Sequence, residues 1–106
     1  MLASNKEIVN QHRITVSSQV GSNWRQLGYE LGGFSNSQMD QLEEKFKAEI
    51  ITFDEMTYQL ILKWEDHSEI QPTVGRLAKA LLKCKMNSAL LAMIALEGAI
   101  ERRELK

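Results

Sequence analysis

Apolar residues recur every three or four positions along most of this 106-residue chain, a spacing that places them on one face of a helix. The clearest stripe covers three turns and consists of Phe53, Met56, Leu60, Ile61 and Trp64. Thr52, with Glu55 three residues later, forms a capping-box signature in front of this stripe. The sequence therefore predicts a helix that begins after Thr52 and buries these residues.

Other segments repeat this spacing between signals that start or stop helices. One covers residues 23–31 and is followed by Gly32-Gly33, which suits the C-terminus of a helix. The next begins at a capping box formed by Ser35 and Gln38 and continues to about Phe46. We expect a helix in each of these segments.

The single proline separates two further helical segments from the rest. Pro72 disfavours helix in the residue before it, and Thr73 can cap a helix that ends near Cys84. The last helix is expected to begin at Met86 or Asn87 and to be mostly buried at its start. The apolar stripe of the first of these helices is Val74, Leu77, Ala78, Leu81 and Leu82, and that of the second is Leu90, Leu91, Met93, Ile94, Leu96 and Ile100.

The N-terminal stretch from Lys6 to Val20 carries two overlapping patterns. Ile14-Thr15-Val16 alternates like a strand, whereas Ile8, Val9, His12, Val16 and Val20 fit a helix. We predict a kinked helix here. Six short amphipathic helices must bury their stripes against one another, which predicts an all-α antiparallel bundle.

The chain length suits one domain, residues 1–106, with a core from about 6 to 104. Trp24 and Trp64 are the largest apolar side chains within the stripes, and we expect both in the core. Glycines inside predicted helices, at Gly28, Gly75 and Gly98, are expected where neighbouring helices approach closely.

Composition excludes several classes of protein. One cysteine cannot form an intramolecular disulfide, and the N-terminus lacks the pattern of a secretory signal, so a cytoplasmic protein is expected. The longest apolar run, Ala89 to Leu96, has eight residues, and about 20 are needed to cross a bilayer, so no membrane insertion is expected. A net charge of −1 argues against a nucleic-acid partner.

Several short motifs occur in a characteristic order. They are Val20-Gly21-x-x-Trp24-x-x-Leu27, then Met39 to Phe46, then Trp64 near the end of the fourth helix, then Thr73-Val74-Gly75-x-Leu77. From about Val16 to Leu96 this pattern resembles the death domain. Within that family it is similar to cytosolic adaptors such as the Fas-associated adaptor and the insect immune-deficiency adaptor.

The resemblance implies a six-helix antiparallel Greek-key bundle that has no catalytic activity and no cofactor. It implies homotypic binding to death domains of receptors, adaptors or kinases in apoptotic or innate-immune signalling, with homo-oligomers among the expected assemblies. It also implies three asymmetric surface pairs. The first joins the second and third helices to the first and fourth, and its residues are Arg25, Tyr29 and Asp40.

The second pair joins the end of the fourth helix and its loop to the turn between the fifth and sixth helices, through Asp66, Glu69, Lys85 and Asn87. The third joins the third helix to the turns before the second and fourth, through Glu43, Glu44, Ser22 and Lys47. Tyr29 is a departure, because several adaptors carry a basic residue there. This difference puts the partner of the first surface in doubt.

Charge is unevenly distributed along the chain. Residues 30–69 contain 10 acidic and 3 basic side chains, whereas residues 70–106 contain 3 acidic and 7 basic ones. The predicted fifth helix and the turn after it contribute Arg76, Lys79, Lys83 and Lys85. Acidic and basic regions of two copies can meet head to tail. Alternatively, the charges are solvated or pair within one chain.

Enzymatic and metal-binding functions have little support in the sequence. His12, His67 and Cys84 are the candidate groups, and their spacing matches no nucleophile or zinc motif. A small helical nucleic-acid-binding domain is the alternative function, because Arg76, Lys79 and Lys83 share a helix face. Membrane-surface binding by the last helix is disfavoured, since its apolar side is better explained as core.

Overall fold

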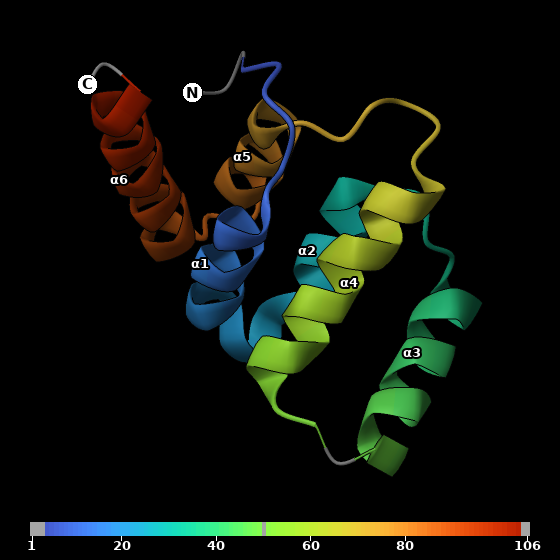
Figure 1. Cartoon of the computed structure of the whole chain (residues 1–106). Coiled ribbons are helices and arrows are strands. Elements are labelled where there is room, and N and C mark those ends of the chain that lie inside the picture. The colour runs from blue at the N-terminus through green and yellow to red at the C-terminus, as the bar shows by residue number, and fades with distance from the viewer. Residues whose placement is uncertain (1–3, 50, 105–106) are drawn as a thin grey trace.

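The computed structural model describes residues 4–49 and 51–104. These residues form six α-helices, which confirms the predicted all-α bundle (Figure 1). One turn of 3-10 helix, η1 (Gly21–Asn23), joins the first two helices. The α-helices are α1 (Asn10–Val20), α2 (Trp24–Leu31), α3 (Asn36–Glu49), α4 (Phe53–His67), α5 (Val74–Lys83) and α6 (Asn87–Glu104).

Helices that are distant in sequence pack side by side. α1 contacts both α6 and α4, α2 contacts α4 and α5, and α5 contacts α6 (Figure 1). α3 lies at the outer edge of the bundle, beyond α4 in this view. Buried residues from all six helices belong to one hydrophobic core.

Three of the predicted helix starts are confirmed by their capping hydrogen bonds. The backbone N–H of Ser35 donates to the side chain of Gln38 at 2.7 Å, and the N–H of Gln38 donates to Ser35 Oγ at 3.2 Å. Thr52 and Thr73 each accept a hydrogen bond at 3.2 Å from the N–H three residues later. These side chains satisfy N–H groups that have no partner within the helix.

The prediction of a helix from Lys6 was wrong at its N-terminal end. α1 begins at Asn10, and the residues before it are extended and lie against the start of α5. The carbonyl of Lys6 accepts the N–H of Val74 at 2.9 Å, and that of Ser4 accepts the N–H of Gly75 at 3.2 Å. The first turn of α5 lacks intrahelical acceptors for these N–H groups, so the extended segment supplies them.

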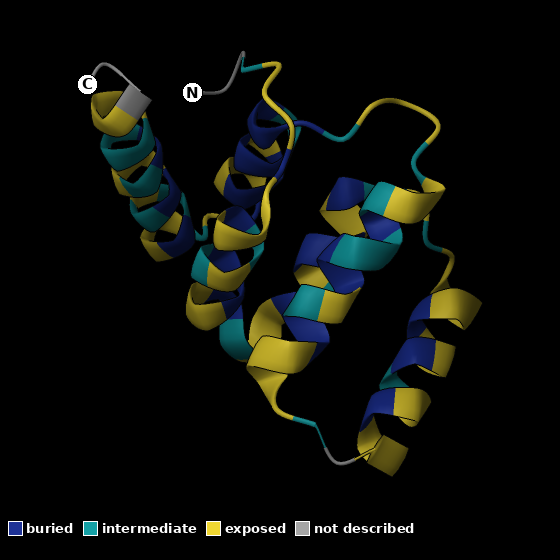
Figure 2. Ribbon diagram, viewed as in Figure 1, coloured by how far each residue is buried: buried dark blue, intermediate teal, exposed yellow. Residues whose placement is uncertain are grey.

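Both tryptophans lie in the core, as predicted, and each is 3% exposed. Figure 2 shows that the helices have buried residues on one side and exposed residues on another. The ring of Trp24 packs edge-on against Phe46, with 5.4 Å between centroids, and so attaches α3 to α2. A Cβ at Gly28 would lie 2.7 Å from Met39 Cε, which confirms close packing there. At Gly98 the same expectation was wrong, because a Cβ would meet no atom within 4 Å.

Four apolar residues predicted to be buried are exposed instead: Phe53, Leu82, Leu91 and Ile94. The correction is largest in α6, which contacts α1 and α5 through a face that includes Ala89, Met93 and Glu97. Leu91, 66% exposed, lies on the other side of this helix. The apolar residues of α6 therefore lie on two sides of the helix, and only one side is buried in the core.

Candidate interaction surfaces

Arg25 contacts three other predicted interface residues, and the four form one cluster between α2 and α3. Its guanidinium donates to Glu43 Oε2 at 3.0 Å, to Asp40 Oδ1 at 2.9 Å and to the Tyr29 hydroxyl at 3.0 Å. The hydrogen bonds to Tyr29 and Asp40 raise the pKa of Arg25 above its ordinary value. The α2/α3 cluster, defined as Arg25, Tyr29, Asp40 and Glu43, contains one cation and two carboxylates, so its net charge is negative.

Residues predicted for the second surface lie near opposite ends of α5. Asp66 is in the last turn of α4, and Glu69 lies in the loop before α5. Glu69 shares a hollow with Arg76, which belongs to the first turn of α5. Lys85 and Asn87 follow the other end of this helix, about 15 Å further along for ten residues. Glu69 and Arg76 therefore line the same hollow, whereas the α5–α6 turn lies at the other end of α5. A contact between Glu69 and this turn must join two separate molecules.

The turn between α5 and α6 has an unusual backbone conformation. Lys85 adopts a φ of 59°, a left-handed conformation that glycine tolerates best. Its side chain is exposed, as are those of Asn87 on α6 and of Glu44 and Lys47 on α3. Glu44 and Lys47 were predicted on the third surface, whereas Glu43, predicted with them, belongs to the α2/α3 cluster.

The cations of α5 and of the following turn differ from those elsewhere. Lys6, Arg13 and Arg25 each form ion pairs within the chain. Arg76, Lys79, Lys83 and Lys85 form none with the carboxylates of residues 4–49 and 51–103. The predicted alternative, pairing within one chain, therefore applies to Arg25 and not to the cations of α5.

A match to a family model decides the class of this bundle. Residues 12–96 match the model of the death domain. The chain belongs to the death-domain family. No curated protein matches it. As a death domain it is a protein-interaction module, and its partners are of the death-fold kind.

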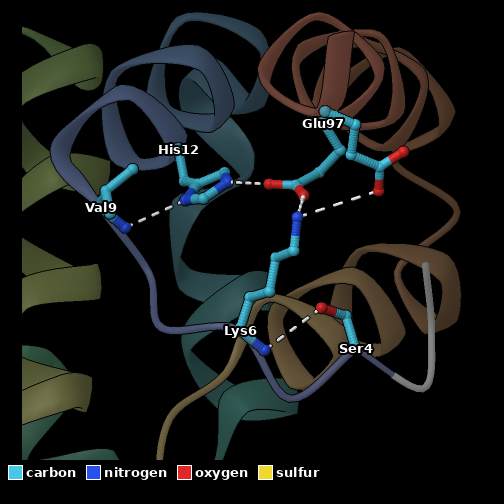
Figure 3. A network of polar contacts seen from close by, with 6 residues as sticks. Ser4, Lys6, Val9, His12 and Glu97 are labelled. Atoms are coloured by element: carbon cyan, nitrogen blue, oxygen red, sulfur yellow. Dashed lines mark hydrogen bonds and ion pairs between the residues drawn. The ribbon is translucent and has the colours of Figure 1, made fainter. Parts of the chain in front are cut away.

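A buried polar network that the sequence patterns did not predict links α1, α6 and the N-terminal segment of this death domain (Figure 3). His12 is 2% exposed and Glu97 is 6% exposed. The N–H of Val9 donates to His12 Nδ1 at 3.0 Å, which leaves the proton on Nε2, facing Glu97. Lys6 Nζ donates to the other carboxylate oxygen at 3.4 Å. Glu97 lies between the two donors because α6 packs directly against α1.

Burial and hydrogen bonding act in opposite directions on this carboxylate. Burial alone raises the pKa of Glu97, but the hydrogen bonds and charges of His12 and Lys6 outweigh it, so the pKa is lowered. On α6 the signal for this network was an acidic residue, Glu97, directly after the apolar run Ala89 to Leu96 and before the apolar Ile100. The position of His12 on the apolar stripe indicated burial, but no local pattern connected it with Glu97, which is 85 residues away.

Cys84, one of the candidate catalytic or metal-binding groups, packs inside this death domain. The Cys84 thiol is buried and donates to the Gln26 carbonyl at 3.6 Å. Burial, with a smaller contribution from Glu30, raises the pKa of this thiol and keeps it protonated. Among the described residues, no three His, Cys, Asp or Glu side chains are placed to hold a metal ion. None of the described helices is long and apolar enough to span a membrane.

Proposed function

We propose that this death domain is the assembly module of a cytoplasmic signalling adaptor in an apoptotic or innate-immune pathway. Its partners are the death domains of receptors, other adaptors or kinases, and further copies of itself. The membership of the family and the resemblance of its motifs to those of adaptors support this role. Binding, rather than chemistry, is the activity.

The observation that carries the proposal is that charges of opposite sign lie unpaired on separate elements. Asp66 and Glu69 near the end of α4 make no ion pair with any described side chain, and the same is true of Lys85 after α5. Such surfaces attract each other between molecules and pair head to tail, because each belongs to a different part of the fold.

The α5–α6 turn adds support from its fixed shape. Lys85 adopts the left-handed conformation common at helix C-termini, and the N–H of Met86 donates to the Leu81 carbonyl at 3.0 Å. This hydrogen bond holds the exposed Lys85 at a defined place after α5. We propose that Lys85, with Asn87, contacts Asp66 and Glu69 of a neighbouring death domain.

Arg76 on α5 is also proposed as an interface residue. The other predicted residues are proposed as contacts of the α2 and α3 side, and they are Arg25, Tyr29, Asp40, Glu43, Glu44 and Lys47. Arg25 orders this side, since it holds Asp40 and Glu43 in fixed positions. Tyr29, 44% exposed, presents an aromatic ring next to that guanidinium. Aromatic and arginine side chains are enriched among residues that dominate protein interfaces.

Light scattering after size exclusion tests the proposal over a range of protein and salt concentrations. We expect assemblies larger than a monomer at low salt that dissociate at high salt, because salt screens exposed charges. Glu44→Lys and Asp66→Lys should each reduce assembly while circular dichroism stays unchanged. Glu7→Lys makes the same charge change at an exposed site in the segment before α1, outside the proposed contacts, and is the matched control. Normal assembly by both test variants contradicts the proposed contacts.

A nucleic-acid partner is the second candidate, favoured by the unpaired cations Arg76, Lys79 and Lys83 on α5. Glu30 lines the same hollow as these three residues and opposes phosphate binding there. Fluorescence anisotropy of a labelled DNA duplex tests this candidate. Affinity that falls steeply with salt supports it, and no measurable binding at low salt eliminates it.

A further inference from the structure

The solvent side of α5 combines one apolar side chain with unpaired cations. Leu82 is 46% exposed, and the exposed Lys79 lies one turn before it on the same side of the helix. Lys83 follows directly and is exposed as well. We call Lys79, Leu82 and Lys83 the α5 surface. A partner complementary to the α5 surface has an apolar pocket for Leu82 and carboxylates near it for the two lysines.

A second feature of the chain has these properties. A hollow between α1 and the start of α4 is lined by Ile14, Ser17, Ser18, Asp54, Glu55 and Tyr58. Ile14 is 54% exposed, and Asp54 and Glu55 are exposed. Neither carboxylate is ion-paired to a side chain in the described part of the chain. We call this feature the α1/α4 hollow.

Two other exposed apolar residues close to acidic groups fit the α5 surface less well. Tyr29 is next to Asp40 and Glu43, but Arg25 already binds both carboxylates. Ile70 shares a hollow with Glu69, but that hollow is lined by one carboxylate and the cation Arg76, whereas the α5 surface has two lysines to accommodate. Of these three features, the α1/α4 hollow is the one with two carboxylates that form no ion pair with a described side chain.

We propose that Leu82 of one copy inserts into the α1/α4 hollow of a second copy, with Lys79 and Lys83 facing Asp54 and Glu55. The inference rests on the proposed self-association and gives it a specific contact. The two surfaces belong to different helices, so the contact is heterologous and propagates head to tail.

This contact differs from the pairing that the family resemblance implies for the α1 and α4 side. There the partner is the α2 and α3 side, whose cluster in this chain is net acidic. Asp54 and Glu55 would then face Asp40 and Glu43 across the interface, and like charges oppose each other. The α5 surface reduces this repulsion, because its two lysines outweigh the one carboxylate beside them, Glu30.

Charge-reversed variants provide the test. Variant A carries Lys79→Glu and Lys83→Glu, and variant B carries Asp54→Lys and Glu55→Lys. Alone, each variant sets like charges against each other, so we expect self-association at least about tenfold weaker than in the native chain. An equimolar mixture restores opposite charges at every contact, and we expect its molar mass by light scattering to recover.

Variant B places two lysines in the first turn of α4, where they oppose the helix dipole and can destabilise the fold. Variants that change no charge therefore provide a second test of the contact. Ile14→Ser and Leu82→Ser should each weaken assembly. Leu91→Ser removes a leucine from α6 that is 66% exposed, more than Leu82, and should not weaken assembly. Melting curves establish that every variant is folded.

The outcomes separate this contact from the proposed function. Recovery of assembly in the mixture, with Leu91→Ser unaffected, supports the contact. Folded variants that show no recovery overturn it, and so does assembly that Asp66→Lys disrupts but variants A and B do not. A native chain that stays monomeric at every concentration and salt overturns the proposed self-association itself.

Discussion

His12 on α1 donates a hydrogen bond to Glu97 on α6 across a contact that is almost closed to solvent. Lys6, from the segment that precedes α1, binds the same carboxylate. Glu97 therefore connects the two ends of the described chain, and its ionised form is the one that both donors stabilise.

We predict that the lowered pKa of Glu97 makes stability depend on pH in the acid range. A carboxyl with a lower pKa in the folded state contributes stability above its unfolded pKa of about 4.3. This contribution is lost as pH falls through the folded pKa. Glu97→Gln should lower the free energy of unfolding at pH 7 by about 1.5–3 kcal/mol. Urea unfolding between pH 3 and pH 7 measures both effects, and equal pH profiles for variant and native chain would contradict this account.

Arg13 and Glu65 form a second link between distant elements, here α1 and α4. Arg13 Nε and Nη2 donate to the two carboxylate oxygens at 2.6 and 2.7 Å, and both side chains are less than a fifth exposed. We predict a coupling free energy of about 1–2 kcal/mol, above that of a fully exposed pair, because the geometry is bidentate. A double-mutant cycle with Arg13→Ala and Glu65→Ala measures it. Arg13→Lys should recover less than half of the coupling, since lysine lacks the two-pronged donor.

The buried thiol of Cys84 leads to a prediction about reactivity. Its raised pKa leaves little thiolate at pH 7, and thiolate is the form that alkylates. We predict slow labelling by iodoacetamide in the folded chain and rapid labelling in urea, read by mass spectrometry. Labelling at the unfolded rate without urea would show that the thiol is accessible.

Local signals were sufficient to predict most of the helices. The caps at Ser35, Thr52 and Thr73 depend on residues three positions apart, and the glycines after α2 have the positive φ values that a helix end favours. The burial of Trp24 and Trp64 followed from the stripes. The extended segment at Lys6 was missed because its hydrogen-bond partner, Val74, lies far away in sequence.

The interaction surfaces could be predicted only in part. The resemblance identified Arg25, Asp40 and Glu43 as surface residues, but it did not show that they pair within one chain. Periodicity predicted that Leu82 and Ile94 were buried, although each belongs to a helix side that no neighbour covers. Which side of an apolar helix is covered depends on packing between helices, and a stripe in the sequence does not contain that information.

The packing at Gly28 leads to a prediction with a matched control on another helix. A side chain at Gly28 must displace Met39 and Leu60, whose nearest atoms lie 2.7 and 3.2 Å from the Cβ position. We predict that Gly28→Leu lowers the free energy of unfolding by about 1–3 kcal/mol, because overpacking outweighs the gain in helix propensity. Gly98→Leu places the same side chain in open space on α6 and should raise it by up to about 1 kcal/mol. Thermal unfolding of both variants measures the difference, and a Gly28→Leu variant that melts at or above the native temperature would mean that α2 and α3 separate at no cost.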